Sequence, residues 1–392
     1  MKTNRLIFTL TALLITGIIL KSCTHSAKVP GIVVNHVPAS SAIYVGSPSI
    51  CILPNGDYIA SHGFFGPRST EWKTAVTAVF KSIDKGNSWE KISEINGQFW
   101  SNIFVHNDLL YIMGTWNHNG NFIIRRSVDG GNSWTDPVDS ETGLLLEGEY
   151  HTAPMPVIVH NGRIWRAIEH IVLFKDSVDT HLCPMVISAP VDDDLLNASN
   201  WKASNYLPFD STYLDGKFKN WLEGNAVVTP EGNLVNILRV STSEKGRQLA
   251  AVVNISEDGS TVSFDPSTGF MDFIGGAVKF SIRYDKISGL YWTISNMVDG
   301  SFTDMDAAIV RNKLILKSSP DLKNWTVNKV LLYHPDVENH AFQYIGWEFD
   351  GSDIIFLSRT AYDDESGGAH SYHDANYITF HRIINFRKLE TK

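Results

Sequence analysis

The chain has 392 residues, of which 43% are hydrophobic and 11% aromatic, so it carries enough apolar side chains for a large buried core. Its formal net charge is −9, and neither a cluster of Lys and Arg nor a glycine-rich phosphate loop occurs in it. This balance argues against nucleic acid as a partner.

The first predicted element is an export signal over residues 1–23. Lys2 and Arg5 precede an apolar run over residues 6–20, which is too short and wrongly flanked for an ordinary membrane-spanning helix. Residues 20–23, Leu-Lys-Ser-Cys, resemble a bacterial lipobox, so Cys23 is the expected lipidation site, and a plain secretory signal is the alternative. Residues 24–30 then read as a tether. No acidic run follows Cys23, which favours a lipid anchor on the periplasmic side of a Gram-negative envelope over display at the cell surface.

Six pairs of apolar strands follow, each joined by a short turn rich in Gly, Asn or Asp. The pairs are 49–53 with 58–61, 102–105 with 109–114, 155–159 with 164–168, 226–229 with 234–240, 278–284 with 290–294, and 342–349 with 353–358. They begin roughly 50 to 70 residues apart, the scale of one four-stranded propeller blade with its loops. The sequence therefore predicts an all-β fold, a single β-propeller over residues 31–392, with six blades countable. Residues 32–35 are expected to pair with the last blade near residues 377–383 and close the ring.

Two octapeptides at equivalent places share one pattern, Ser-x-Asp-x-Gly-x-x-Trp. They are residues 82–89 and 127–134, with altered copies at 319–325 and 256–259. The pattern resembles the Asp box of sialidase-like propellers, in which a carboxylate accepts turn amide hydrogens and glycine supplies a positive φ. Such turns are structural, so they indicate the scaffold and leave the chemistry open.

Cofactor and metal signals are weak. Cys51 and Cys183 lie in apolar strand-like runs, where buried free thiols are expected and a disulfide is the alternative. His370, His373 and Asp374 lie close enough in sequence for a metal site, but a hydrogen-bonded loop is the preferred interpretation. We therefore expect no cofactor and no metal.

Propeller topology brings the beginnings of the first strands and the ends of the second strands to one mouth. This rule gathers a set of polar residues: His62, Tyr150, His151, Arg166, Glu223, Arg239, Gln343 and Arg359. Three arginines at equivalent positions predict a cationic pocket suited to a carboxylate. The alternative is that these residues simply solvate a water-filled channel.

Several segments together resemble one family. These are residues 34–41 (Val-Asn-His-Val-Pro-Ala-Ser-Ser), 44–49, 342–344, 358–364 and the tail from 370 to 382, which includes His373. They are similar to the propeller α-L-rhamnosidases of gut Bacteroides-type bacteria, glycoside hydrolase family 145. One departure is Gly63, where the family often has an aspartate.

The resemblance implies seven blades and exo-acting removal of terminal L-rhamnose linked α-1,4 to D-glucuronic acid, a cap on plant arabinogalactan-type glycans. It places a single catalytic histidine at His36, with His62, Tyr150, His151, Arg166, Arg239, Arg359, Gln343 and His373 as substrate-binding candidates. The implied partner is a uronate-containing plant oligosaccharide. The protein itself is expected to be a monomer whose only membrane contact is its lipid anchor. The family's site lies on the opposite propeller face, whereas the topology here puts His36 on the arginine side.

Three other functions stay open. A sialidase would need a tyrosine–glutamate pair, for which Tyr344 and Glu348 are candidates, and an arginine on the first inner strand, where this chain has Ser47. A uronate lyase would use Arg166 with Tyr150 or His151, or His62, as base and acid. A propeller without catalysis would bind glycans through the same arginines.

Overall fold

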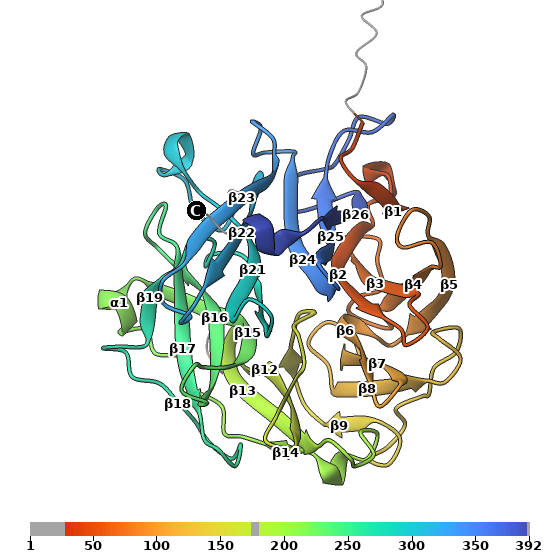
Figure 1. Cartoon of the computed structure of the whole chain (residues 1–392), viewed down its shortest axis with the longest axis vertical. Helices are drawn as coiled ribbons and strands as arrows, with labels where there is room; N and C mark the ends of the chain where they lie inside the picture. The colour runs from red at the N-terminus through yellow and green to blue at the C-terminus, as the bar shows by residue number, and fades with distance from the viewer. Residues whose placement is uncertain (1–27, 174–179, 390–392) are drawn as a thin grey trace, which may run out of the picture.

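The computed structural model describes residues 28–173 and 180–389, which form six antiparallel sheets arranged around a centre (Figure 1). The expected export signal, the expected lipidation site Cys23 and residues 24–27 of the expected tether lie outside the described residues. Val29 is buried against the fifth and sixth sheets, so the chain is already packed before its first strand begins. Among the residues described, no helix has the length and apolar character to cross a membrane.

Each sheet forms one blade, whose strands run outward from the centre. Blade 1 contains β2 (Tyr44–Ile52), β3 (Tyr58–Phe65), β4 (Val76–Ser82) and β5 (Glu90–Asn96), and blade 2 contains β6 (Phe99–His106), β7 (Leu109–Thr115), β8 (Phe122–Ser127) and β9 (Leu144–Leu146). Blade 3 contains β10 (Tyr150–His151), β11 (Ile158–His160), β12 (Arg163–Leu173), β13 (Thr180–Pro190) and β14 (Lys202–Ala203). Blade 4 contains β15 (Phe218–Val228), β16 (Leu234–Thr242), β17 (Leu249–Ile255), β18 (Val262–Ser263) and β19 (Phe270–Asp272).

Blade 5 contains β20 (Ser281–Asp285), β21 (Leu290–Asn296), β22 (Lys313–Ser319) and β23 (Thr326–Tyr333), and blade 6 contains β24 (Ala341–Asp350), β25 (Asp353–Ala361), β26 (Tyr377–Ile383) and β1 (Ile32–His36). The helical segments are short: α1 (Tyr213–Gly216) and the 3₁₀ turns Ala39–Ser41, Ala198–Asn200, Gly300–Phe302 and Phe386–Leu389. The inner strand of blade 3 is split into β10 and β11 because Pro154 and Pro156 lack the N–H that a ladder needs.

The ring closes as the sequence predicts. β1 pairs with β26 so that Ile32 faces Phe380 and His36 faces Tyr377. The first and last segments of the propeller thus share one sheet, and β1 covers the outer edge of β26.

The blade number implied by the family resemblance is wrong for the described chain, which has six sheets and not seven. The long segments that left room for another blade belong to blades already counted. The region around 170–220 supplies β13 and β14, and the region 296–340 supplies β22 and β23. Long loops, not extra strands, account for the remaining length.

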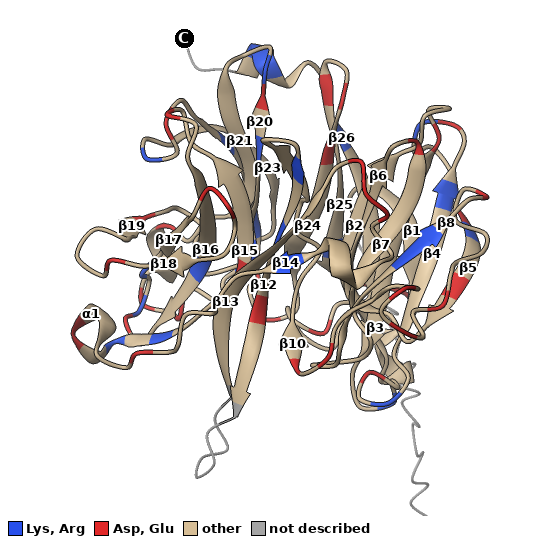
Figure 2. Cartoon of the chain, turned by 90° about the horizontal axis from the view of Figure 1, so that it is seen from below, with Lys and Arg blue, Asp and Glu red and all other residues tan. Residues whose placement is uncertain are grey.

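The core lies between neighbouring blades. One cluster joins Val45, Tyr58 and Phe80 of blade 1 to Leu357 and Phe380 of blade 6. Four fully buried tryptophans fill the inner part of blades 3 to 6: Trp165, Trp221, Trp292 and Trp347. Cys51 and Cys183 are buried free thiols, as expected. Charged residues of both signs are spread over the strands and loops (Figure 2).

The repeated acidic turns join the third strand of a blade to the fourth. In the first copy the Asp84 carboxylate accepts from the amide of Ser88 at 2.9 Å and from the hydroxyl of Ser82 at 2.8 Å. Asp129 makes the same two bonds with Ser133 and Ser127, at 2.9 and 2.8 Å. These turns lie at the outer edge of the blades, away from the residues that line the two mouths.

Candidate active site

The two mouths of the propeller differ in their chemistry. We call the mouth at which the inner strands begin the front mouth; it carries the loops 66–75, 116–121, 243–248, 297–312 and 362–376. We call the mouth at which the first and second strands are joined by hairpins the rear mouth. Most of the polar residues gathered by the topology rule lie toward the front-mouth ends of their strands, but Arg166 does not: β12 continues to Leu173, so Arg166 lies in the half of that strand nearer the rear mouth.

Besides the bulge after Val45 in β2, three inner strands carry a β-bulge just inside the front mouth that holds a residue on left-handed backbone. The pairing register shifts after Phe99 in β6, after Leu222 in β15 and after Gln343 in β24. In each bulge one side chain sits on left-handed backbone: Trp100 at φ 41°, Glu223 at φ 58° and Tyr344 at φ 53°. Such backbone costs on the order of 1–3 kcal/mol per residue, and bulges re-aim side chains beside active sites.

Two of these re-aimed side chains share one guanidinium. Arg239, on β16, donates from Nη1 to a Glu223 carboxylate oxygen at 2.8 Å and to the Tyr344 hydroxyl at 3.4 Å. Arg239 and Glu223 are buried, whereas Tyr344 is partly exposed. A buried ion pair therefore stands directly beside a reachable phenol.

Two more arginines lie against the Tyr344 ring. The Arg359 guanidinium, on β25, is 4.8 Å from the ring centroid, and that of Arg311, in loop 297–312, is 5.3 Å from it. The described hydrogen bonds leave one terminal nitrogen unused on each of the three arginines: Nη2 of Arg239, Nη2 of Arg311 and Nη1 of Arg359. Converging guanidinium donors of this kind suit a carboxylate.

The charges around Tyr344 oppose one another. Burial and the Glu223 carboxylate raise the pKa of Tyr344, but the guanidiniums of Arg311, Arg239 and Arg359 outweigh them, so the pKa lies below its ordinary value of 10.0. Burial lowers the pKa of Arg359 to about 10. The phenol is thus easier to ionise than a tyrosine in water.

Loop 362–376 is tied to this group by hydrogen bonds. Gln343 accepts from Arg311 Nη1 at 2.5 Å and donates to the Tyr372 carbonyl, while Arg359 donates to the His373 carbonyl. The His373 side chain bonds to Asp374 at 2.9 Å and is 44% exposed. Burial and the Arg359 charge lower the pKa of His373 to about 4.

The predicted site residues divide into two groups. Arg239, Arg359, Gln343 and the His373 backbone meet around Tyr344, as described above. His62, Tyr150, His151 and Arg166 do not contact Tyr344 in the described structure.

Each of these four has local partners. His62 is buried between Asn35 and the Gly63 carbonyl, and its burial lowers its pKa to about 4. Arg166 is fully buried and donates to Thr152 and to the Ala153 carbonyl at 2.6 and 2.5 Å.

His151 and Tyr150 complete this second group. His151 pairs with Glu169 at 2.9 Å, and Glu169 also accepts from the amide of Gly224, next to Glu223. Tyr150 is buried in the apolar cluster between blades 2 and 3.

His36 lies at the front-mouth end of β1, the outermost strand of blade 6. Its Nε2 is 2.9 Å from a carboxylate oxygen of the buried Asp364, and its side chain is 35% exposed. Its ring stacks on Tyr377 with centroids 4.3 Å apart. None of its described contacts reaches Tyr344, so the structure holds two separate titratable groups at one mouth.

Sequence reasoning missed two parts of this arrangement. It considered Tyr344 with Glu348, but Glu348 pairs with Arg283 at 2.9 Å instead. The glutamate beside Tyr344 is Glu223, from a different blade. The strand-end rule does not reach Arg311, because Arg311 lies in a long loop rather than at a strand end.

One cluster of described side chains has the residue types of a metal site: His334, Asp336 and His340. His340 bonds to Asp336 at 2.6 Å, and the two imidazoles stack with centroids 3.6 Å apart and planes 15° from parallel. Because a metal must lie near the plane of each ligating ring, face-to-face imidazoles cannot both bind one ion well. The geometry fits a hydrogen-bonded histidine pair better than a metal centre.

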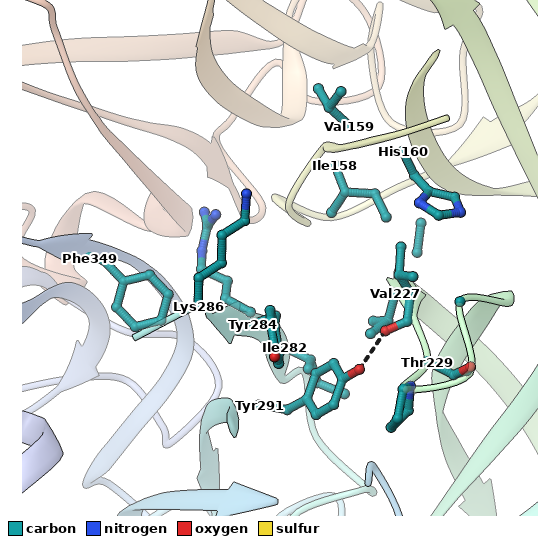
Figure 3. A pocket seen from close by; sticks show the side chains of 15 residues that line it. Ile158, Val159, His160, Val227, Thr229, Ile282, Tyr284, Lys286, Tyr291 and Phe349 are labelled. Carbon is teal, nitrogen blue, oxygen red and sulfur yellow. Dashed lines mark hydrogen bonds between the residues drawn. The ribbon is translucent and has the colours of Figure 1, made fainter. Parts of the chain in front are cut away.

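The rear mouth holds a hollow of about 660 Å³ lined by residues of blades 3 to 6 (Figure 3). Apolar and aromatic side chains such as Ile158, Val227, Ile282, Tyr284 and Phe349 line it, together with Lys286, Arg283 and His160. None of its lining residues is acidic. It therefore lacks the carboxylate that most glycoside hydrolases place at the reacting bond.

No protein-family model matches the chain, and no curated relative matches it. Among solved structures, a protein of unknown function from Dyadobacter fermentans is 13% identical, with a TM-score of 0.59, over 91% of this chain and 100% of that one. The Trypanosoma rangeli sialidase in complex with sialic acid is 14% identical, with a TM-score of 0.54, over 88% of this chain and 55% of that one. The Penicillium chrysogenum α-L-arabinanase complexed with arabinobiose is 14% identical, with a TM-score of 0.51, over 91% and 98%. At these identities the likeness is one of fold: the chain has a β-propeller fold that known glycoside hydrolases use.

Proposed function

We propose that this protein is an exo-acting glycoside hydrolase that removes a terminal sugar bearing a carboxylate, with Tyr344 as nucleophile and Glu223 as its base. The observation that carries the proposal is the shared guanidinium: Arg239 bonds to both the Glu223 carboxylate and the Tyr344 hydroxyl. Two further arginines against the Tyr344 ring supply the charge that an acidic sugar requires.

A tyrosine suits a sugar whose carboxylate lies at or near the anomeric carbon. An Asp or Glu nucleophile would approach that carboxylate with a like charge, whereas a phenol is neutral until its proton leaves. Sialidases, which cleave such 2-keto sugar acids, are the known glycosidases with a tyrosine nucleophile. The lowered pKa of Tyr344 assists the same step.

The reaction proceeds in two displacements. Glu223 takes the phenol proton, the Tyr344 oxygen bonds to the anomeric carbon, and the bond to the leaving oxygen breaks as that oxygen receives a proton. We assign this proton to His370 of loop 362–376, whose ring bonds to Asp374 at 2.8 Å; His373 is the poorer donor because burial and the Arg359 charge lower its pKa. Water then attacks the anomeric carbon and gives a proton to His370, while the bond to the Tyr344 oxygen breaks and Glu223 returns its proton to the phenol. The sugar leaves with retained configuration.

A second candidate is the α-L-rhamnosidase acting on rhamnose–glucuronate caps, with His36 as the catalytic residue. The His36–Asp364 pair favours it, because a half-exposed imidazole oriented by a buried carboxylate is a usual acid–base arrangement. In this scheme the three arginines hold the glucuronate. A uronate lyase would use the same arginines and Tyr344 as base.

One experiment separates these functions. The purified protein is incubated with sialyl, glucuronyl and rhamnosyl–glucuronate oligosaccharides, and products are followed by chromatography and ultraviolet absorbance. Release of the free acidic sugar supports the first proposal, free rhamnose supports the second, and an unsaturated uronate means elimination. A fluorinated substrate that traps the glycosyl–enzyme should label the peptide containing Tyr344; stable labelling of another residue, or no turnover of any substrate, contradicts the proposal.

We further propose that the enzyme works at the cell envelope, anchored through Cys23. The export signal and lipobox-like segment support this location. Cys23→Ala should move the protein from the membrane fraction to the soluble fraction, and retention in the membrane would exclude this anchor.

A further inference from the structure

An exposed tryptophan lies in a front-mouth loop of blade 1. Trp72, in loop 66–75, is 61% exposed. Its ring stacks on His118 of loop 116–121, with centroids 4.0 Å apart and planes only 5° from parallel. The imidazole covers one face of the indole and leaves the other toward solvent, which is an unfavourable place for so large an apolar surface.

This stack is held by a buried carboxylate. Glu71, only 8% exposed, bonds through one oxygen to His118 Nδ1 at 3.0 Å and through the other to the amide of Gly66 at 3.2 Å. The backbone of His118 also donates to the Glu71 carbonyl at 2.8 Å. Two loops from neighbouring blades are thus tied together so that the Trp72 ring is fixed before any ligand arrives.

Ring contacts continue from this stack to the candidate site. His118 lies 6.3 Å from Trp100, the residue re-aimed by the bulge in β6, and Trp100 lies 5.9 Å from Phe65. The Arg359 guanidinium then lies over the Phe65 ring at 4.4 Å and over the Tyr344 ring at 4.8 Å. The aromatic row therefore runs from Tyr344 outward along blades 1 and 2.

We propose that Trp72, His118 and Trp100 form the subsite for the leaving group, and that this leaving group is a neutral saccharide. The inference rests on the proposed function, because a leaving-group subsite must adjoin the reacting bond. Sugars present flat C–H faces that stack on fixed aromatic rings, and the rigid rings cost little entropy on binding. The cationic group at Tyr344 selects the acidic terminal sugar, and the aromatic row selects what it is attached to.

The test compares two leaving groups on one acidic sugar. Wild type and Trp72→Ala are assayed on the methyl glycoside of sialic acid and on sialyllactose. We expect Trp72→Ala to lower kcat/KM for sialyllactose about tenfold, chiefly through KM, and to leave the methyl glycoside unchanged. Trp116→Ala is the control, because Trp116 is also exposed, at 41%, but its ring lies over Arg125. Equal losses on both substrates, or no loss on either, overturn the subsite.

A second measurement keeps the subsite separate from the proposed function. Lactose, cellobiose and galactobiose are titrated into wild type and Trp72→Ala, and binding is followed by tryptophan fluorescence and saturation-transfer NMR. If wild type hydrolyses no acidic sugar but binds one of these disaccharides through Trp72, the proposed function fails and the saccharide subsite stands. If none of them binds wild type and sialyllactose is not preferred over the methyl glycoside, the subsite is refuted.

Discussion

Replacing Tyr344 by phenylalanine removes one oxygen and little else. The ring keeps its contacts with Arg359 at 4.8 Å and Arg311 at 5.3 Å, and Arg239 keeps its 2.8 Å bond to Glu223. The lost contact is the 3.4 Å hydrogen bond from Arg239, worth about 1 kcal/mol or less in net stability. A nucleophile that acts together with its base, by contrast, contributes at least about 10³-fold to kcat. Tyr344→Phe should therefore unfold almost as wild type does and be nearly inactive.

The matched control is Tyr291→Phe at the rear mouth. Tyr291 donates a 2.7 Å hydrogen bond to the Val228 carbonyl, so its loss should cost about 1 kcal/mol of stability and leave kcat unchanged. Thermal unfolding and initial rates on the substrate that wild type cleaves are measured for both variants. The reasoning is refuted if Tyr344→Phe keeps more than a tenth of the wild-type kcat, or if Tyr291→Phe is the inactive variant.

Three further predictions concern the scaffold. Burial raises the pKa of Asp364, but hydrogen bonds from His36, Gly368 and Asn376 outweigh burial and lower the pKa to about 2. The ionised carboxylate should therefore add about 2 kcal/mol to the free energy of unfolding above pH 4. Asp364→Asn should be less stable than wild type at pH 7, and urea titrations should show this difference vanishing as the pH falls to 2. Lys317 lies over the Phe273 ring, and its burial lowers its pKa, so the unfolded chain binds more protons than the folded chain below pH 10. Lys317→Met removes this cost of folding. It should raise the urea midpoint at pH 7, and by less as the pH approaches 10. Deleting residues up to 36 should expose the β26 edge and abolish cooperative unfolding in calorimetry, and an unchanged transition would contradict the closing role of β1.

The scaffold was readable from sequence because its signals are local. Turns such as Pro54-Asn55-Gly56-Asp57 lie between two short apolar runs, and the structure places a hairpin there, between β2 and β3. The closing strand was also predictable, since an unpaired apolar segment at the start of a ring of sheets has one sheet left to join. Blade number was not, because loop length alone does not say whether a segment forms strands.

The candidate site was only partly readable. Arg239 and Arg359 fall at equivalent second-strand ends, so the topology rule placed them together. Arg311 escaped the rule because loop 297–312 brings it back over the mouth, where its Nε donates to the Ala308 carbonyl at 2.7 Å. No repeating sequence pattern predicts that a loop residue folds back over the mouth, because this depends on how the loop packs.

The pairing of Glu223 with Tyr344 was not readable, because β-bulges bring these two side chains together. Strict alternation points successive side chains of a strand to opposite faces, and an extra residue in β15 and in β24 breaks that count just inside the mouth. The sequence does carry a trace of each bulge, a glycine inside an apolar strand: a Cβ on Gly224 would lie 2.1 Å from the Asn236 side chain, and one on Gly346 would lie 2.5 Å from the Pro48 carbonyl. Glycine is required there because a neighbouring side chain or strand approaches closely next to the bulge, one residue after Glu223 and two residues after Tyr344. An isolated glycine near the start of a propeller's inner strand therefore indicates that the residues just before it are the ones to test for chemistry.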